Sequence, residues 1–319
     1  MDYLTAPVAE NCDRKRGDGS FKSRGRAVLK RIRSSQPFNG LATSLVSGIF
    51  GIAGHRSDLV IKHLHRVGHV RRVLPNGSTL RLWSLGDDWI SNQVYWRGWA
   101  GYEPETVPLF YRLATRARTT LDVGAYVGFY TLLAAHANPS SRVFAFEPLE
   151  DVYGRLQRHI KINRLANAQC IRAAVGDFDG ESDFYCGAGD VPCSSSLSFE
   201  FMRSVAQLRV SRVPVITLDQ FVRENAVEHV DLMKIDTETT EPQVLRGMMK
   251  TIRRDAPAII CEVLGRGSEQ ALEDLLGPLG YRFYHLTDDG PILRDRISGH
   301  PLWLNYLFTR LAPSEVSKL

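Results

Sequence analysis

A glycine-containing turn is the first stretch of this chain whose residue types could bind a ligand. The apolar run Leu121-Asp122-Val123 holds one acid, and Gly124 and Gly128 follow it before the helical run Phe129–Ala135. Glycine permits a tight turn and close approach of a ligand to the main chain, while the helix N-terminus supplies N–H donors. The stretch predicts a nucleotide-binding turn, although such turns serve many nucleotides.

An acid at the end of the next expected strand limits which class of ligand the turn could bind. Glu147, in Phe146-Glu147-Pro148, lies about twenty residues beyond the glycines, the offset of an acid that grips ribose hydroxyls. The Gly124-x-x-x-Gly128 spacing is not the Gly-x-Gly-x-x-Gly pattern that cradles a pyrophosphate. It suits a nucleoside with a zwitterionic tail, such as S-adenosylmethionine. Asp177, after the third strand, would lie where an adenine edge is read.

Three acids in six residues follow the fourth expected strand: Asp236, Glu238 and Glu241. Ligands of open α/β sheets bind outside the carboxyl ends of the strands, so this cluster is expected at the site. If S-adenosylmethionine is the ligand and a hydroxyl receives its methyl group, a base must take the hydroxyl proton. Asp236 and Glu238 are the preferred candidates. Glu241, next to Pro242, is equally explained as the acid that starts a helix.

Two further residues are candidates for the base. Glu262 ends the fifth strand, where an acid after an apolar run needs a partner. His285 could reach the same end of the sheet, but a surface or hydrogen-bonded histidine explains it at least as well. Asp236 and Glu262 with a third oxygen could hold Mg²⁺, yet no ligand spacing requires a metal and none is assigned.

From Thr119 onward, near-continuous apolar strands alternate with helices, which predicts a mostly parallel sheet covered on both faces. The seven expected strands are Thr119–Val123, Arg142–Glu147, Ala168–Val175, Val230–Asp236, Ala258–Val263, Tyr281–Leu286 and Trp303–Thr309. The expected helices are Gly128–Ala137, Glu150–Arg164, Leu218–Ala226, Pro242–Arg254 and Glu269–Leu276.

Two segments interrupt or precede this alternation. Glu181–Cys186 and Leu208–Ile216 are expected to form an inserted strand pair around the Gly/Ser-rich loop Gly187–Ser198, a candidate lid. Upstream, Asn76-Gly77 predicts a hairpin between His69–Leu74 and Thr79–Leu85. The aromatic segment Trp89–Tyr102 is explained equally by packing onto the sheet and by a lid that binds the acceptor.

Charge is unevenly distributed along the 319 residues, whose net charge is +5. Between Arg14 and Arg33 there are nine Lys or Arg residues and one acid, Asp18, so the rest of the chain is near neutral. Nucleic acid is therefore not an expected partner, and a solvated basic tail is the simplest explanation of this charge.

The apolar run Leu41–Ala53 is too short and too rich in Gly and Ser to span a bilayer, so any membrane contact is expected to be peripheral.

The five cysteines form no Cys-x-x-Cys pair and are odd in number, which favours reduced thiols and a cytoplasmic enzyme.

The chain is expected to consist of four parts. Residues 1–38 form a basic, disordered arm, and 39–101 a helix, hairpin and aromatic cap; 102–311 form the catalytic domain and 312–319 a tail.

The motifs together resemble the FkbM family of S-adenosylmethionine-dependent methyltransferases. They are Leu-Asp-Val-Gly-Ala-x-x-Gly-x-Tyr-Thr, Phe-Glu-Pro, Asp-Gly-Glu after a small-residue run, and Lys-Ile-Asp-x-Glu-x-x-Glu-Pro-x-Val-Leu-Arg-Gly. The resemblance covers about Tyr102 to Val263. It implies a class I methyltransferase fold: an α/β, doubly wound, Rossmann-like sheet of seven strands, here with an N-terminal α/β extension and an inserted β-hairpin.

The resemblance also implies roles for single residues. Asp122, Gly124, Ala125 and Gly128 would line the methionine end of S-adenosyl-L-methionine, and Asp236 would lie close to the transferred methyl. Glu147, followed by Pro148, would bind the ribose, and Asp177 would lie near the adenine. The family usually has Asn at Tyr126 and Gly-Ala at Thr239-Thr240. Tyr126 is therefore expected to crowd or stack near the cofactor, and the threonines to alter the floor of the acceptor site.

The expected function is O-methylation (EC 2.1.1 type) of a hydroxyl on a sugar, glycolipid or polyketide-type small molecule. The alternatives are a methyltransferase for another acceptor, namely an amine, a carboxylate or RNA, and a homologue that binds the cofactor without catalysis. A homodimer is left open.

Overall fold

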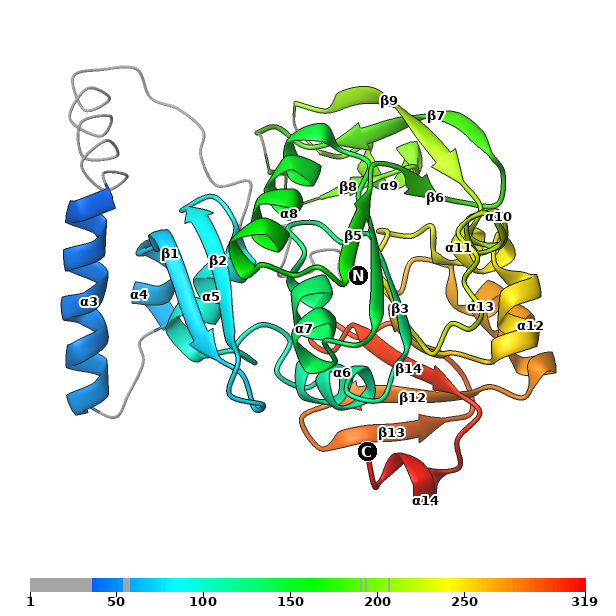
Figure 1. Cartoon of the computed structure of the whole chain (residues 1–319). Coiled ribbons are helices and arrows are strands. Elements are labelled where there is room, and N and C mark those ends of the chain that lie inside the picture. Colours follow the sequence, from blue (N-terminus) through cyan, green and yellow to red (C-terminus); the bar gives the residue numbers. More distant parts are fainter. Residues whose placement is uncertain (1–35, 54–57, 190, 193, 206) are drawn as a thin grey trace, which may run out of the picture. The chain divides into compact units, whose positions relative to one another are not determined.

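A computed structural model describes residues 36–53, 58–189, 191–192, 194–205 and 207–319 (Figure 1). The described chain divides into two compact units, which meet in sequence between Glu103 and Pro104. Residues 1–35 of the predicted basic arm lie outside the described residues, while residues 36–38, also assigned to the arm, belong to a helix.

The N-terminal unit consists of helices around one hairpin. It comprises α3 (Gln36–Ala53), α4 (Asp58–His63), β1 (Val67–Val73), β2 (Thr79–Leu85) and α5 (Trp89–Arg97). The predicted hairpin is confirmed: β1 and β2 pair antiparallel, and Gly77 turns between them with φ +82°. No helix of the described residues is long and apolar enough to cross a membrane.

The predicted aromatic segment supplies α5 and packs within this unit. The Trp96 side chain is buried, and its indole N–H donates to the Leu64 carbonyl at 2.9 Å. The Tyr95 ring lies 5.2 Å and 5.3 Å from the guanidinium carbons of Arg66 and Arg72. For Tyr95 and Trp96 these contacts favour the packing role over the lid.

The second unit is built on one large mixed sheet with the strand order β13-β12-β14-β11-β10-β3-β4-β5. Its strands are β3 (Thr119–Val123), β4 (Arg142–Phe146), β5 (Ala168–Ile171), β10 (Leu232–Ile235), β11 (Ala258–Glu262), β12 (Arg282–Thr287), β13 (Gly290–Arg294) and β14 (Asn305–Thr309). The five strands from β11 to β5 pair parallel, and β14, β12 and β13 add antiparallel ladders. The predicted α/β, mostly parallel sheet is therefore confirmed.

The sheet has eight strands, so the prediction of seven was one short. The additional strand, β13, begins at Gly290, which has φ +91°, and pairs with β12 at the edge of the sheet. Three of its five residues are exposed and one is Pro291, so its short sequence does not indicate a core strand. Proline is tolerated on an edge strand because the missing N–H costs no ladder bond there.

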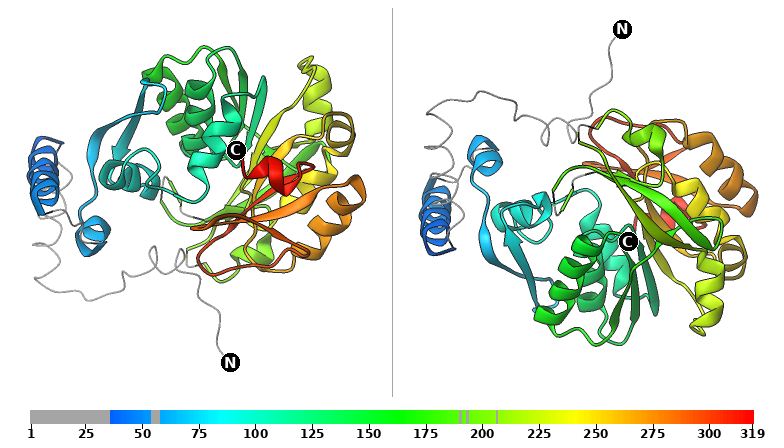
Figure 2. Two further views of the ribbon diagram at one scale, coloured as in Figure 1. Left: turned by 90° about the horizontal axis from the view of Figure 1, so that it is seen from below. Right: turned by 90° about the horizontal axis from the view of Figure 1, so that it is seen from above.

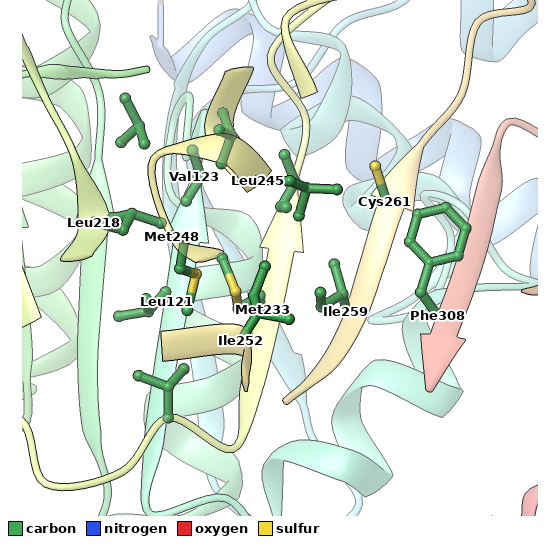
Figure 3. Close-up of a cluster of buried hydrophobic side chains, with 14 of the residues drawn as sticks. Leu121, Val123, Leu218, Met233, Leu245, Met248, Ile252, Ile259, Cys261 and Phe308 are labelled. Carbon is green, nitrogen blue, oxygen red and sulfur yellow. The ribbon is translucent and has the colours of Figure 1, made fainter. Parts of the chain in front are cut away.

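Helices cover both faces of this sheet (Figure 2). Contacts with β3, β4 and β5 place α7 (Phe129–Ala137) and α8 (Glu150–Asn163) on one face, where α6 (Val107–Ala114) packs on α7. On the other face lie α10 (Leu218–Glu224), α11 (Glu241–Arg246), α12 (Met249–Asp255) and α13 (Glu269–Leu276). Figure 3 shows the core there: Leu121, Met233 and Ile259 from three strands meet Leu218, Leu245 and Ile252 from the helices.

The predicted insertion forms a sheet of its own, with the order β6-β9-β7-β8. The predicted strand pair is confirmed: β7 (Gly180–Cys186) and β9 (Arg209–Ile216) are antiparallel, and β8 (Ser195–Ser196) adds to β7. The single strand predicted over Ala168–Val175 was wrong. Its first half is β5 of the large sheet, and its second half is β6 (Ala174–Val175), which pairs with β9.

The helix predicted over Pro242–Arg254 is also two elements, α11 and α12. The break lies at Gly247, where an added Cβ would come 2.0 Å from the Gly176 carbonyl oxygen. The main chain before Asp177 thus approaches the end of α11 so closely that only glycine fits.

Candidate functional site

Two turns meet at the carboxyl ends of β3 and β10. Gly124 has φ +78°, and a Cβ on it would lie 1.8 Å from the Asp236 carbonyl oxygen. The Asp236 N–H donates to the Val123 carbonyl at 2.9 Å. Gly128 caps α7 in the left-handed conformation, with φ +87°. The glycine turn and the acidic cluster, more than a hundred residues apart in the chain, therefore form one site.

Asp122 and Lys234 lie side by side beneath this site. They are register partners on the parallel strands β3 and β10, so their side chains share a face of the sheet. Asp122 is buried and accepts a hydrogen bond from the Thr131 hydroxyl of α7 at 2.5 Å. Burial raises its pKa to about 6, against the lowering effect of Thr131 and of the Lys234 charge.

Lys234 is 1% exposed and connects the buried acid to the site. Its Nζ lies 3.4 Å from Oδ2 of Asp236 and 5.2 Å from the centre of the Tyr130 ring. An ammonium is almost never fully buried without partners, so this lysine depends on its acidic and aromatic neighbours. Lys234 was not among the residues predicted for the site. The signal was present, because a lysine stands inside the apolar run of a predicted central strand.

Glu147 is held by the main chain on both carboxylate oxygens. Tyr126 N–H donates to Oε2 at 3.1 Å, and Leu149 N–H donates to Oε1 at 2.8 Å. Burial raises the pKa of Glu147 to about 8, and the Asp122 charge acts in the same direction. Pro148 beside it and Ala125 in the glycine turn are also buried.

Tyr126 adopts φ +50°, a conformation that Asn tolerates better than most other residues. Its half-buried side chain packs against an apolar cluster that joins α8 to the inserted sheet and includes Val152, Phe184 and Val213. Packing against the insertion accounts for an aromatic residue here. The expected contact with a cofactor stays a prediction.

The acidic loop after β10 is organised by Glu241. Its Oε1 accepts hydrogen bonds from the N–H and the hydroxyl of Thr237, at 3.2 Å and 3.1 Å, and from Thr239 N–H at 3.1 Å. Burial raises the pKa of Glu241 to about 7. Because α11 also begins at Glu241, its structural role is well supported.

Glu238 and Thr239 lie at the tip of this loop with φ +55° and +83°. The pKa of Glu238 is raised, first by burial and then by the charges of Asp236 and Glu241. The hydroxyl of the buried Ser196, in β8, donates to the Glu238 carbonyl at 2.7 Å. The inserted sheet is therefore anchored on the acidic loop through part of the predicted lid, Gly187–Ser198.

Register places Glu262 with the site and His285 away from it. Lys234 is the partner of Ile260, so Glu262, two residues later, faces the same side of the sheet as Lys234. His285 is the partner of Tyr306, which is the partner of Cys261, and these three face the opposite side.

His285 is fully engaged in packing on that opposite side. Its ring stacks on Tyr306 at 4.5 Å, and its Nε2 donates to the Trp303 carbonyl at 2.9 Å. Burial lowers its pKa. The structure thus supports the non-catalytic explanation of His285.

Asp177 follows β6 and is partly exposed. Its Oδ2 accepts from Nε of Arg246, in α11, at 2.9 Å, so the carboxylate is fixed beside the Gly176–Gly247 contact.

Within the described part of the chain, no three His, Cys, Asp or Glu side chains are arranged to hold a metal ion.

Comparison with known families decides the classification. The model of the methyltransferase FkbM domain matches residues 122–288, which is more than half of the chain and contains the whole site. The chain belongs to the FkbM methyltransferase family. The resemblance seen in the sequence motifs is thereby confirmed.

Two curated proteins share part of this FkbM chain. AMB antimetabolite synthetase AmbE of Pseudomonas aeruginosa is 27% identical over 199 residues, which are 50% of this chain and 9% of that protein. Methyltransferase 1 of Beauveria bassiana is 28% identical over 145 residues, which are 40% of this chain and 57% of that protein. The matched segments thus span little more than half of the second relative and a small part of the first.

Solved structures include similar chains. An FkbM methyltransferase from Methylobacillus flagellatus matches with a TM-score of 0.41 and 15% identity, over 60% of this chain and 43% of that one. An O-methyltransferase from Bacillus cereus, in complex with SAH, matches with a TM-score of 0.38 and 13% identity, over 65% of this chain and 79% of that one.

Thr239 stands where the FkbM family usually has glycine, and its φ of +83° is strained for a β-branched residue. We expect Thr239→Gly to stabilise the chain by about 1 kcal/mol, since strain relief of about 1–3 kcal/mol exceeds the entropic cost of glycine. Thr115→Gly is the matched control, because Thr115 has φ −59° and gains nothing. Urea unfolding measures both. Destabilisation of both variants to the same extent would show that Thr239 is unstrained.

The raised pKa of Glu147 predicts how stability depends on pH. Its pKa is about 8 when folded and 4.5 in the reference state, so the folded chain binds more protons between these values. Its stabilising contribution is full below pH 4.5 and is lost as the pH rises to 8. Without ligand, the unfolding free energy should fall across this window, and Glu147→Gln should remove up to about 1 kcal/mol per pH unit of that slope. Parallel profiles for Glu147→Gln and the wild type would contradict this assignment.

Proposed function

We propose that this chain is an S-adenosylmethionine-dependent methyltransferase that methylates a hydroxyl group of a small molecule. The proposed acceptors are sugars, glycolipids and polyketide-type metabolites. The observation that carries the proposal is the contact between the glycine turn at Gly124 and the acidic loop at Asp236 in a chain of the FkbM family. Such a contact brings a nucleoside-binding turn and candidate bases to one edge of the sheet.

The residues present fit the cofactor. The turn from Gly124 to Gly128 lets a ligand approach the main chain at the N-terminus of α7. Both Glu147 oxygens are oriented by one backbone N–H each, and each keeps a lone pair for a ribose hydroxyl. When bound, S-adenosylmethionine supplies a methyl group on a sulfonium, a carbon open to in-line displacement. Asp177 is proposed to lie near the adenine.

The base is proposed to be one of the two acids in the loop. With S-adenosylmethionine bound, a carboxylate of this loop would accept the proton of the acceptor hydroxyl while the methyl group is transferred and S-adenosylhomocysteine leaves. Asp236 is half-buried and next to the Gly124 turn, with Lys234 balancing its charge. Glu238 is the second candidate, because it lies two residues further along the same loop and burial raises the pKa of its carboxyl. Ser196 anchors the insertion on this loop, which suits exclusion of water from the reaction.

A panel of acceptors tests the proposal. The full chain, incubated with S-adenosylmethionine and sugars, glycolipids or polyketide alcohols, should release S-adenosylhomocysteine with at least one class, and Asp236→Asn should release far less. Turnover only with amines, carboxylates or RNA would contradict the hydroxyl acceptor. Cofactor binding without turnover on any acceptor would favour a non-catalytic homologue. A cytoplasmic location and a homodimer stay predictions from the sequence.

A further inference from the structure

Helix α3 of the N-terminal unit carries exposed apolar side chains. Leu41, Leu45 and Ile49 are 62%, 61% and 62% exposed. Their spacing of four residues places them in one stripe along the helix. We define these three residues as the α3 stripe.

The same helix docks onto its own unit through polar groups. The buried Asn39 accepts a hydrogen bond from Val67 N–H at 2.7 Å and donates to the His65 carbonyl at 2.8 Å. One turn further, the buried Thr43 hydroxyl accepts from Nη1 of Arg66 at 2.8 Å. A surface helix of a globular protein normally turns its apolar stripe inward. Here specific hydrogen bonds fix the helix with the apolar stripe outward, so the exposure is built into the fold.

The sequence next to α3 identifies the partner by its charge. Nine Lys or Arg residues and one acid lie between Arg14 and Arg33, just before the helix begins at Gln36, and the helix itself contains no charged residue. A basic cluster next to an apolar helical stripe fits an anionic lipid surface, with the stripe among the acyl chains and the cations at the headgroups. The same charges would oppose pairing of the stripe with a second copy of the chain, because two basic clusters would be brought together.

We propose that α3 and the preceding basic segment bind the chain peripherally to an anionic phospholipid surface. The inference is independent of the methyltransferase reaction. It assigns the N-terminal unit a binding role of its own, with the stripe supplying apolar contact and the basic segment supplying charge. Binding should therefore need both parts.

Co-sedimentation of the full chain with vesicles tests the proposal. The chain should bind vesicles of phosphatidylcholine with about one third phosphatidylserine, bind phosphatidylcholine alone much more weakly, and be released by salt. Changing Leu41, Leu45 and Ile49 together to Gln should weaken binding to the anionic vesicles by about tenfold or more. Changing Arg24, Arg26, Lys30 and Arg31 together to Gln should do the same.

A matched control separates the α3 stripe from general hydrophobicity. Leu302, in the other unit, is 69% exposed, and Leu302→Gln should leave vesicle binding unchanged. Thermal unfolding should not change in the stripe variant, because its residues are exposed. The proposal is overturned if the wild type does not bind anionic vesicles, if it binds neutral vesicles equally, or if the stripe variant binds like the wild type. If the wild type is a dimer and the stripe variant is a monomer that still binds vesicles, the stripe is a contact between copies.

Discussion

Asp236→Asn is expected to lower kcat by at least ~100-fold while leaving the affinity for S-adenosylmethionine almost unchanged. The carboxylate lies at the contact between the two turns, and loss of a general base typically costs about 10²–10⁴ in rate. Asn keeps the shape of Asp and can still contact Lys234, so the fold should persist. Steady-state kinetics and titration calorimetry with the cofactor separate the two effects.

Asp288→Asn is the matched control, since this acid is exposed in the same unit and should be neutral. An active Asp236→Asn variant would contradict the assignment of Asp236 as the base. Glu238 would then be tested by Glu238→Gln, followed by Glu262, which faces the same side of the sheet as Lys234.

Glu147→Ala is expected to weaken binding of S-adenosylmethionine by ~100-fold. Two ribose hydroxyls lose their acceptor, and each hydrogen bond is worth about 0.5–1.5 kcal/mol to a neutral carboxyl and about 1.5–3 kcal/mol to a charged one, which Glu147 becomes above its pKa of about 8. The N–H groups of Tyr126 and Leu149 also lose their shared partner, which loosens the turn that would hold the ligand. Calorimetric titration of the purified variant measures the loss.

Glu150→Ala is the control, because the Glu150 side chain is 82% exposed and pairs only with Arg172 in the described structure. Thermal unfolding shows whether Glu147→Ala is folded before its affinity is interpreted. Unchanged cofactor affinity in both Glu147→Ala and Asp122→Ala would remove the basis for placing the cofactor at this edge of the sheet.

The elements that position the site could be predicted because their sequence signals are local. The strand around Asp122, the glycines after it and the acid Glu147 each follow from an apolar run that ends in a turn. The contact between Gly124 and Asp236 is not local, since it depends on β3 and β10 being neighbours in the sheet. Before the structure, these motifs were linked by the rule that ligands of open α/β sheets bind at the carboxyl ends of the strands, and by the family resemblance.

Other features could not be predicted because they depend on pairing between distant segments. The run Ala168–Val175 looks like one strand. Its last two residues, however, form β6, which pairs with β9 in a separate sheet. Ser196 reaches Glu238 only because β8 adds to that sheet. The exclusion of His285 from the site follows from its register with Tyr306, which strand periodicity alone does not fix.

Lys234 and Tyr126 could have been interpreted further from the sequence. A lysine inside the run Leu232–Ile235 must be buried if the strand is central, and it then needs acidic neighbours. Asn, the usual residue at position 126, is one of the few residues that adopt a positive φ readily, so the unusual backbone of Tyr126 was foreseeable.

A crystal structure of the chain with S-adenosylhomocysteine tests the central claim most directly. The ribose hydroxyls should lie within hydrogen-bond distance of the Glu147 carboxylate, with the amino-acid end against the Gly124–Gly128 turn and the sulfur near Asp236. A ligand bound elsewhere, or a Glu147 carboxylate without a ribose contact, would contradict the assignment of this edge of the sheet as a methyltransferase site.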